Sequence, residues 1–488
     1  MRDEEGNPNP TAWSLDGRSF HFECPMSQAA AVGSMVMVST GEVDYIGQVG
    51  ESEESPSRAG GGRRIVLGGG TLLGKVHDGG VTALSRRESF ERATIGALPD
   101  SVVEALTSPP ADGAAALDLG LLHDPDDARA QLIAAGFNRH TFLCGQSGSG
   151  KTYTLGLVLE QLLLETTLRI VVLDPNSDYV GLDRLQADMG HRVPGPVHVF
   201  RQQGEHRLQI RFGRLPARQM AMVLGLDPLR EMEEYDELRK LTADLGTTEY
   251  SLLDIRRSFE RERAEQSKAR RRLLLRIDNL GIADWSIWAE AGEAPLLDQL
   301  GSSWRAAILD LGQLDSSQER STVAASVLAG LWQQRHQRQP VLVVIDEAHN
   351  VCPRDPMDAH EALAVEHTID IAAEGRKYGL YLLLATQRPE KLPVNVLSQC
   401  ENLLLMRTNS VSDVNYLAEL FAHIPRGLIG LAPGFQQGEG LAAGRISPRP
   451  QLFRSGRRRS PEGGADVPTT WAYPAPLSEA RGAESLKD

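Results

Sequence analysis

Residues 141–165 read TFLCGQSGSGKTYTLGLVLEQLLLE and set the architecture of the chain. An apolar run at 141–145 leads into a loop of glycines and serines, and a helix-forming run follows from about Lys151 to Thr166. The loop from Gly145 to Thr152 is a complete G-x-x-x-x-G-K-[ST] phosphate-binding loop, called the P-loop below. Its glycines permit backbone torsions that turn successive N–H groups toward one anion, and the N-terminus of the following helix adds unpaired donors. This pattern predicts a site for nucleotide phosphates.

The P-loop motif gives each of its residues an expected role. We expect Lys151 to reach the β- and γ-phosphates of ATP, and the Thr152 hydroxyl to ligate Mg²⁺. The apolar run before the loop and the helix-forming run after it argue against the alternative, a chance loop of small residues. The rest of the nucleotide-binding set is Gly145, Gln146, Ser147, Gly148, Ser149 and Gly150.

A second apolar run, VLVVI at 341–345, ends in two adjacent acids. It matches a Walker B strand, in which Asp346 holds Mg²⁺ through its water shell. Glu347 is placed to polarise a water molecule for in-line attack on the γ-phosphate. We interpret His349 as a supporting or packing residue rather than a catalytic one.

Other polar residues stand near the ends of apolar runs. Gln387 ends the run 381–387 and is expected to sense the γ-phosphate or orient the attacking water, with a strand-end cap as the alternative. Arg376 and Arg407 are candidates for an arginine finger toward a neighbouring subunit, or for a salt bridge within their own. Asp174 and Asp178 either line the nucleotide pocket or cap their loop.

The apolar runs after residue 140 do not alternate with polar residues, which is typical of strands buried on both faces of a parallel sheet covered by helices. The fold class is therefore α/β, with a mostly parallel sheet. The expected strands are 141–145, 169–174, 196–200, 306–311, 341–347, 381–387 and 402–407.

The rest of the chain divides by composition. Short β-type runs with turns between them predict a small antiparallel β-barrel near the N-terminus. A charged stretch with helical period predicts a helical insertion, in which 256–276 holds nine basic and three acidic residues. That stretch is either an ion-paired helix face or a phosphate-facing surface. The expected units are a disordered N-terminus at 1–19, the barrel at 20–90, the P-loop ATPase core at 91–214 and 301–453, the helical insertion at 215–300, and a disordered tail at 454–488.

Composition excludes several classes of protein. The 488 residues are 41% hydrophobic and 24% charged, which rules out collagen-like, fully disordered and disulfide-scaffold chains. A net charge of −14 excludes a uniformly basic nucleic-acid-binding coat, although a local basic channel remains compatible. The 4 cysteines are far apart and lie in apolar runs, as buried thiols of a reducing compartment do. Without a membrane-length apolar run or a signal-peptide pattern, we expect a cytoplasmic protein with no membrane segment.

Five segments, taken in order, resemble a known family. The order GQSGSGKT, LDPNSDY, VVIDEAHN, EGRKYGLYLLLATQRP and LSQCENLLLMRTNSVSD is similar to that of the HerA-type ATPases, which belong to the HerA/FtsK group of P-loop DNA translocases. The β-rich N-terminal unit and the helical insertion also stand where this family carries a small barrel and a helical subdomain. The resemblance covers about residues 20–453 and is most specific in the motor segments.

The resemblance implies a RecA-like P-loop NTPase core that assembles into a homo-hexamer, with ATP and Mg²⁺ at subunit interfaces. It implies double-stranded DNA in a central channel and a nuclease partner, in DNA end processing or anti-phage defence. Position by position, Lys151 and Thr152 match Walker A, Asp346 and Glu347 match Walker B, and Gln387 matches the strand-end sensor. Arg376 matches the arginine of the GRKYG element, which lies close to an interface in such rings.

Other functions compete with an ATP-driven DNA translocase or helicase. The main alternative is a nucleotide-gated oligomeric scaffold for a nuclease or another effector, in which hydrolysis is slow. DEAH-box RNA helicases share GxSGSGKT and DEAH, but they need a second motor domain, and only about 100 residues follow Gln387. Secretion and conjugation ATPases share the core but accompany membrane systems. A small-molecule kinase would need a lid and an acceptor pocket that the sequence does not display.

Overall fold

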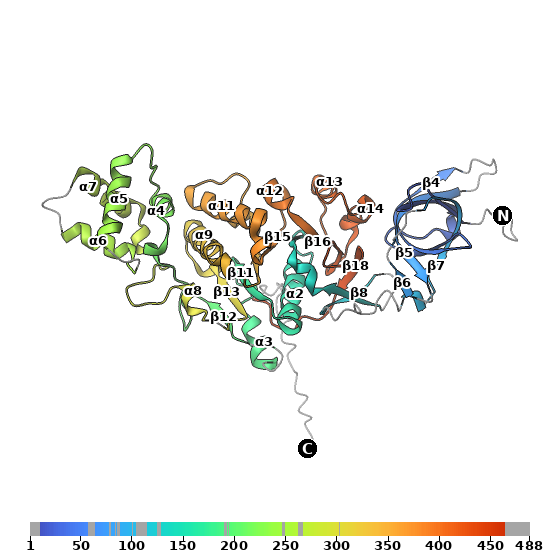
Figure 1. Cartoon of the computed structure of the whole chain (residues 1–488), viewed down its shortest axis with the longest axis horizontal. Coiled ribbons are helices and arrows are strands. Elements are labelled where there is room, and N and C mark those ends of the chain that lie inside the picture. The colour runs from blue at the N-terminus through green and yellow to red at the C-terminus, as the bar shows by residue number, and fades with distance from the viewer. Residues whose placement is uncertain are drawn as a thin grey trace, which may run out of the picture.

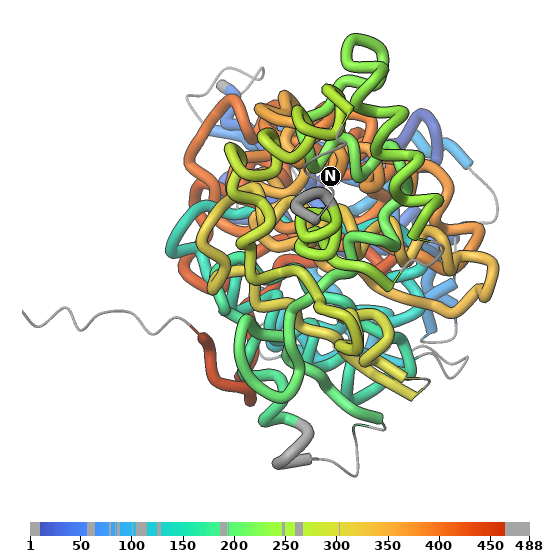
Figure 2. Tube along the Cα trace, turned by 90° about the vertical axis from the view of Figure 1, so that its left-hand side faces the viewer, coloured from blue at the N-terminus to red at the C-terminus, as the bar shows by residue number. Residues whose placement is uncertain are grey.

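The computed structural model describes residues 10–56, 64–77, 80–82, 84, 88–99, 101–103, 115–123, 128–189, 193, 195–245, 249–261, 267–301 and 303–463. Three parts follow one another along the longest axis of the molecule (Figure 1): a group of helices, a central sheet covered by helices, and a barrel. Figure 2 looks along that axis from the helical end and shows the green insertion in front of the core.

The barrel consists of antiparallel strands in the order β2-β1-β7-β3-β4-β5-β6, closed by pairing of β2 with β5. Aromatic and β-branched side chains, among them Phe20, Phe22 and Val38, fill its interior. Gly70 permits this packing, because a Cβ there would lie 2.5 Å from the Phe20 ring. The strands are β1 (Thr11–Ser14), β2 (Ser19–Pro25), β3 (Met35–Ser39), β4 (Asp44–Pro56), β5 (Arg64–His77), β6 (Gly80–Thr82) and β7 (Phe90–Ala97).

The barrel is longer than the sequence predicted. Its first strand lies inside the segment 1–19, which was expected to be disordered, and its last strand continues past residue 90 to Ala97. The short strand β1 was missed because it holds only 4 residues between polar and glycine-containing neighbours, and its pairing with β2 and β7 supplies the missing stability. Residues 1–9 lie outside the described residues.

The central sheet has the order β12-β13-β11-β14-β15-β10-β16-β17-β18-β8-β9. The seven strands from β12 to β16 are parallel, and the pairs from β16–β17 to β8–β9 are antiparallel. The predicted α/β fold with a mostly parallel sheet is thereby confirmed. The strands are β8 (Ala116–Leu122), β9 (Arg129–Ile133), β10 (His140–Cys144), β11 (Arg169–Asp174), β12 (Val197–Phe200), β13 (Ala306–Asp310), β14 (Val341–Ile345), β15 (Leu380–Thr386), β16 (Cys400–Met406), β17 (Glu439–Ala443) and β18 (Gln451–Ser455).

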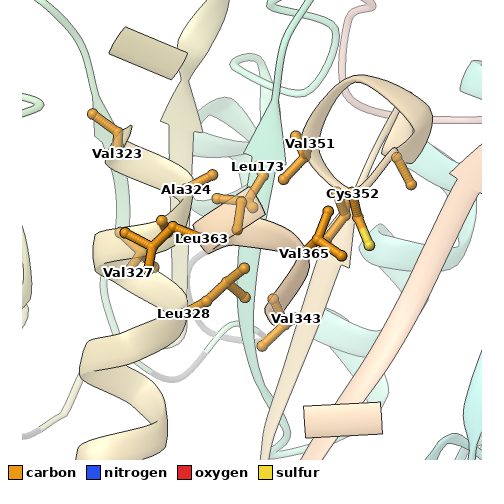
Figure 3. Packing of buried hydrophobic residues seen from close by; sticks show 14 of the residues in the cluster. Leu173, Val323, Ala324, Val327, Leu328, Val343, Val351, Cys352, Leu363 and Val365 are labelled. Carbon is orange, nitrogen blue, oxygen red and sulfur yellow. The ribbon is translucent and has the colours of Figure 1, made fainter. Parts of the chain in front are cut away.

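Helices cover both faces of this sheet. Alternate residues of β11 face opposite sides: Ile170 and Val172 pack toward α2 and α3, and Val171 and Leu173 toward α9 and α11. Figure 3 shows Leu173 and Val343 against Val323, Ala324, Val327 and Leu328 of α9 and Leu363 and Val365 of α11. The helices of the core are α2 (Lys151–Glu165), α3 (Leu182–Met189), α9 (Ser317–Gln333), α10 (Ala348–Val351), α11 (Ala359–Glu374), α12 (Val394–Leu397), α13 (Val411–Leu420) and α14 (Arg426–Ile429).

The helical insertion lies between β12 and β13. It contains α4 (Ala217–Val223), α5 (Met232–Asp244), α6 (Leu252–Arg261), α7 (Lys268–Leu280) and α8 (Leu296–Gln299). Basic residues of α7 are paired with acids of α5 and of its N-cap: Arg270 with Glu237 at 2.8 Å, Arg272 with Glu234 at 2.8 Å, and Arg276 with the N-cap residue Glu231. These contacts favour the ion-paired alternative for 256–276, of which 262–266 lie outside the described residues.

Two segments differ from what the sequence predicted. Strand β9 was not among the expected strands, and it forms because Arg129–Ile133 pairs with β8. The segment predicted as a disordered tail from 454 is ordered to residue 463, where Arg458 is buried against the core. Residues 464–488 lie outside the described residues.

All four cysteines, Cys24, Cys144, Cys352 and Cys400, are buried and free, as the sequence predicted. Within the described ranges, no helix has the length and apolar character that a bilayer crossing requires.

Candidate nucleotide site

The candidate site lies at the carboxyl edge of the parallel strands. Strand β15 separates β10, which leads into the P-loop, from β14, which leads into Asp346. The register pairs Cys144 with Thr386 and Ile345 with Leu384, so the three strands end close together. Ligand sites of open α/β sheets form at this edge, where loops from neighbouring strands meet.

The backbone of the P-loop has the conformation that its glycines allow. Gly148 has φ 73° and Gly150 has φ 93°, both in the left-handed region, and α2 begins directly at Lys151. Ser149 is fully buried, and its Oγ atom has no hydrogen-bond partner among the described residues. A buried hydroxyl beside a helix N-terminus fits a loop whose donors serve a bound anion.

Lys151 joins the P-loop to the two acids. Its Nζ atom lies 2.8 Å from Asp346 Oδ1 and 2.7 Å from Glu347 Oε1. Burial acts to lower the pKa of Lys151, but the attraction of both carboxylates outweighs burial and the pKa lies above its usual value. The fold thereby brings Lys151 into direct contact with two residues that lie 195 and 196 positions further along the sequence.

Asp346 is fully buried and well supported. Besides Lys151, its carboxylate accepts hydrogen bonds from the Tyr179 hydroxyl at 3.1 Å and from the Glu347 backbone N–H at 2.8 Å. Burial, and next the charge of Asp346, raise the pKa of Tyr179 well above its usual value, so the phenol stays protonated and donates. Tyr179 was not singled out by the sequence, and its only signal there is its place in DPNSDY after a buried strand.

Glu347 adopts an unusual backbone conformation. Its φ of 42° lies in the left-handed region, which costs a residue with a Cβ of order 1–3 kcal/mol. Such strain persists only where surrounding contacts hold it. His349 supplies one of them, because its Nδ1 atom lies 3.3 Å from Glu347 Oε2 and 2.9 Å from Thr386 Oγ1. Burial lowers the pKa of His349 although Glu347 raises it, so the ring is neutral and supports Glu347.

The loop at 174–181 closes one side of the site. Asp174 accepts backbone hydrogen bonds from Asp178 at 3.0 Å and Tyr179 at 2.8 Å, so its contacts are those of a loop cap. Burial raises the pKa of Asp174 to about 7, against the effect of these hydrogen bonds. Burial and then the charge of Asp346 raise the pKa of Asp178 to about 6, which places Asp178 within the electrostatic reach of the site.

Two further predicted residues, Gln387 and Arg407, directly follow strands that end beside the P-loop. Gln387 is half-buried and directly follows β15, between the P-loop and Asp346. Arg407 follows β16 and donates to the carbonyl of Gly148 at 3.1 Å, so it lies on the P-loop of its own chain. This contact argues against Arg407 as a finger for a neighbour, since the guanidinium is held at its own site.

Arg376 lies at the opposite edge of the sheet. It precedes β15, whose 7 residues at about 3.3 Å each separate it from the P-loop edge by roughly 20 Å. There it pairs with Glu401, which also lies 3.1 Å from Arg139. The structure therefore does not bring Arg376 to the nucleotide site of its own chain.

The donors at the site fit a hard divalent cation. Thr152 and Asp346 offer a hydroxyl and a carboxylate, and Mg²⁺ prefers oxygen ligands and keeps several waters. No group of three or more histidine, cysteine, aspartate or glutamate side chains suited to a metal occurs within the part of the chain that is described.

The sheet order, the P-loop and the adjoining acids define a RecA-like P-loop NTPase. Residues 117–330 match the family model described as "Helicase HerA, central domain". This match confirms the predicted resemblance to the HerA-type ATPases over the central part of the chain.

Individual relatives agree with this assignment. The chain is 30% identical over 127 residues to the "DNA double-strand break repair helicase HerA" of Sulfurisphaera tokodaii, covering 26% of this chain and 25% of the relative. It is 21% identical over 339 residues to the protein of the same name from Sulfolobus acidocaldarius, covering 67% of each. The chain thus spans a quarter of the first relative and two thirds of the second. The solved structure of VirB4 of Thermoanaerobacter pseudethanolicus shares the fold, with a TM-score of 0.52 and 16% identity over 72% of this chain and 98% of that one.

Proposed function

We propose that this protein is an ATP-hydrolysing, ring-forming translocase or helicase of double-stranded DNA that acts with a nuclease partner in DNA end processing or anti-phage defence. The observation that carries the proposal is the convergence of Lys151, Asp346 and Glu347 within 2.8 Å beside a P-loop. The match to the HerA central-domain model and relatives named as DNA double-strand break repair helicases support a DNA substrate. The nuclease partner rests on the family resemblance.

Each group at the site has a chemical task in this proposal. The backbone N–H groups of the P-loop and Lys151 bind the β- and γ-phosphates, so that Lys151 exchanges carboxylate partners for phosphate oxygens. Thr152 and Asp346 would hold Mg²⁺, which when bound would neutralise charge on the transferred phosphoryl group. Glu347 orients and polarises the attacking water, and the neutral His349 ring keeps its carboxylate in place. Gln387 lies where an amide can contact that water or the γ-phosphate.

The place of Arg376 supports a ring. An arginine roughly 20 Å from its own P-loop cannot stabilise charge there, but it can serve a neighbouring subunit that packs against this edge. A single motor domain per chain also needs a neighbour to complete its site. We therefore assign the finger to Arg376, which would exchange its Glu401 partner for a neighbour's phosphate, and a role at its own P-loop to Arg407.

ATP hydrolysis by the purified chain, with and without duplex DNA, tests the proposal. Lys151→Ala should abolish nucleotide binding, and Glu347→Gln should bind ATP while its turnover falls by about 10²–10⁴-fold, the usual contribution of a general base. Glu233→Gln on the exposed face of α5 is the matched control and should hydrolyse ATP normally. Undiminished hydrolysis by Glu347→Gln would remove the mechanism.

DNA dependence separates the motor from the nucleotide-gated scaffold. Duplex DNA should stimulate hydrolysis strongly, and DNA affinity should fall steeply with salt because phosphate contacts release counterions. A rate of ATP hydrolysis that duplex DNA does not change, or a DNA affinity that salt does not change, would favour the scaffold. Mass measurement with and without ATP and DNA reports the subunit number.

A further inference from the structure

The segment at 456–463, here called the strap, runs along the P-loop helix α2. The backbone N–H of Arg458 donates to the Tyr153 hydroxyl at 2.7 Å, and that of Arg459 to the Glu160 carboxylate at 2.9 Å. Tyr153, Gly156 and Glu160 are three and four residues apart and therefore share one helix face. In Figure 1 the chain passes from β18 toward α2 before its C-terminal end.

Gly156 allows the closest part of this approach. A Cβ atom at position 156 would lie 2.3 Å from Arg458 Cζ. The Arg458 side chain is 1% exposed and the Glu160 side chain 0% exposed, so the guanidinium has no free space into which it could withdraw. The strap is thus packed into the core along a groove that the missing side chain of Gly156 creates.

Arg458 joins α2 to the loop at 174–181. Its Nε atom lies 3.8 Å from Glu160 Oε1, its Nη2 atom donates to the Asp178 carbonyl at 3.2 Å, and its Cζ atom lies 5.8 Å from the centre of the Tyr179 ring. The Gly463 backbone N–H donates to the same carbonyl at 3.2 Å. One guanidinium therefore contacts both the helix that follows the P-loop and the loop that carries Tyr179.

Tyr179 extends this line of contacts to the Walker B aspartate. Its ring is fully buried under Arg458, and its hydroxyl donates to Asp346 Oδ2 at 3.1 Å. The opposite oxygen, Asp346 Oδ1, faces Lys151. The orientation of the Asp346 carboxylate therefore depends on where the Tyr179 ring lies.

We propose that Arg458 is a positioning residue for the Asp346 carboxylate, acting through the Tyr179 ring and hydroxyl. The inference rests on the proposed function, in which Asp346 holds Mg²⁺. It adds the strap to the segments that set the orientation of the Asp346 carboxylate. Residues that hydrogen-bond a metal ligand set its orientation, and their loss costs about 10–100-fold in metal affinity or activity.

The main test uses the Mg²⁺ concentration that gives half-maximal ATP hydrolysis. Arg458→Met is combined with Glu160→Gln, because removing both members of a buried ion pair leaves no unpaired charge in the core. We expect the half-saturating Mg²⁺ concentration to rise by about 10–100-fold. At saturating Mg²⁺ the KM for ATP should stay within about twofold of wild type.

Arg457→Met by itself is the matched control, because Glu160→Gln without a change at Arg458 would leave that buried guanidinium without its carboxylate partner. Arg457 is exposed, one position away, and the control makes the same kind of substitution without touching Tyr179. It should keep the wild-type Mg²⁺ dependence. Equal Mg²⁺ dependence in the Arg458→Met combination and in Arg457→Met would overturn the proposal, because the strap would then serve stability alone.

Two further variants test the route through Tyr179. Tyr179→Phe removes only the hydroxyl, and adding it to the Arg458→Met combination should shift the Mg²⁺ dependence no further. Gly156→Ala improves helix propensity, yet its Cβ displaces Arg458, so it should also raise the half-saturating Mg²⁺ concentration. The route through Tyr179 would be refuted if Tyr179→Phe raised the half-saturating Mg²⁺ concentration of the Arg458→Met combination further. It would also be refuted if Gly156→Ala kept the wild-type Mg²⁺ dependence.

A readout without nucleotide separates this inference from the proposed function. The backbone N–H groups of Asp178 and Tyr179 are bound to Asp174, and hydrogen exchange measures how firmly their loop is held. The Arg458→Met combination should exchange faster there than its Arg457 control. If the wild-type protein does not hydrolyse ATP, the proposed function fails, and the hydrogen-exchange result alone decides whether Arg458 positions the loop. Equal exchange rates in the Arg458→Met combination and the Arg457 control would overturn the role of Arg458.

Discussion

Replacing Lys151 should weaken the folded protein as well as nucleotide binding. In Lys151→Met, Asp346 loses its cation while its side chain stays 0% exposed, and Glu347, 12% exposed, loses the same partner. Removing one partner of a buried ion pair costs about 3–5 kcal/mol. We assign this cost to Asp346, because Glu347 retains contact with water. At about 2–4 °C per kcal/mol for a unit of 150–250 residues, the melting temperature should fall on the order of 10 °C.

The measurement is thermal unfolding without nucleotide, compared with two further variants. Lys151→Met combined with Asp346→Asn should recover more than half of the loss, since both buried charges are then gone. Lys240→Met breaks a Lys–Asp pair of similar length, 2.6 Å, whose lysine side chain is 64% exposed, and should leave the melting temperature unchanged. The reasoning fails if Lys151→Met melts like wild type, or if adding Asp346→Asn makes it less stable.

Two other predictions concern subunit contacts and pH. Mixing Glu347→Gln subunits with Arg376→Ala subunits should restore hydrolysis at about a quarter of the sites, because each intact site takes one residue from each neighbour. Mixing Glu347→Gln with Arg407→Ala should restore nothing, and the reverse pattern of ATPase rates would contradict our assignment. Burial raises the pKa of Asp174 from 3.8 to about 7, so its carboxyl increasingly destabilises the fold as the pH rises between these values. The melting temperature of Asp174→Asn relative to wild type should therefore increase from pH 5 to pH 8, and a flat or falling difference would refute this.

Local patterns in the sequence were enough to predict the core of the site. The P-loop occupies eight consecutive residues, and its chemistry depends on torsions and donors within that stretch. Asp346 and Glu347 directly follow an apolar strand, and parallel strands bring such ends to one edge of the sheet. The contact of Lys151 with both acids is therefore the expected result of the pattern.

The sequence did not predict the contacts between segments that lie far apart along the chain. Strands β1, β9, β17 and β18 are short or mixed in polarity, and pairing with neighbours decides their conformation. The segment from 456 to 463 looked like a polar tail because Arg458 is charged, and only its pairing with Glu160 explains its burial.

The sequence by itself determined the P-loop, the Walker B acids and the α/β class, because each is written in neighbouring residues whose backbone geometry follows from their own chemistry. Only the tertiary structure decided that Arg407 lies at its own P-loop, that Arg376 lies at the far edge, and that Tyr179 supports Asp346. Those placements depend on strand order and on the packing of loops from remote parts of the chain, which no local spacing encodes.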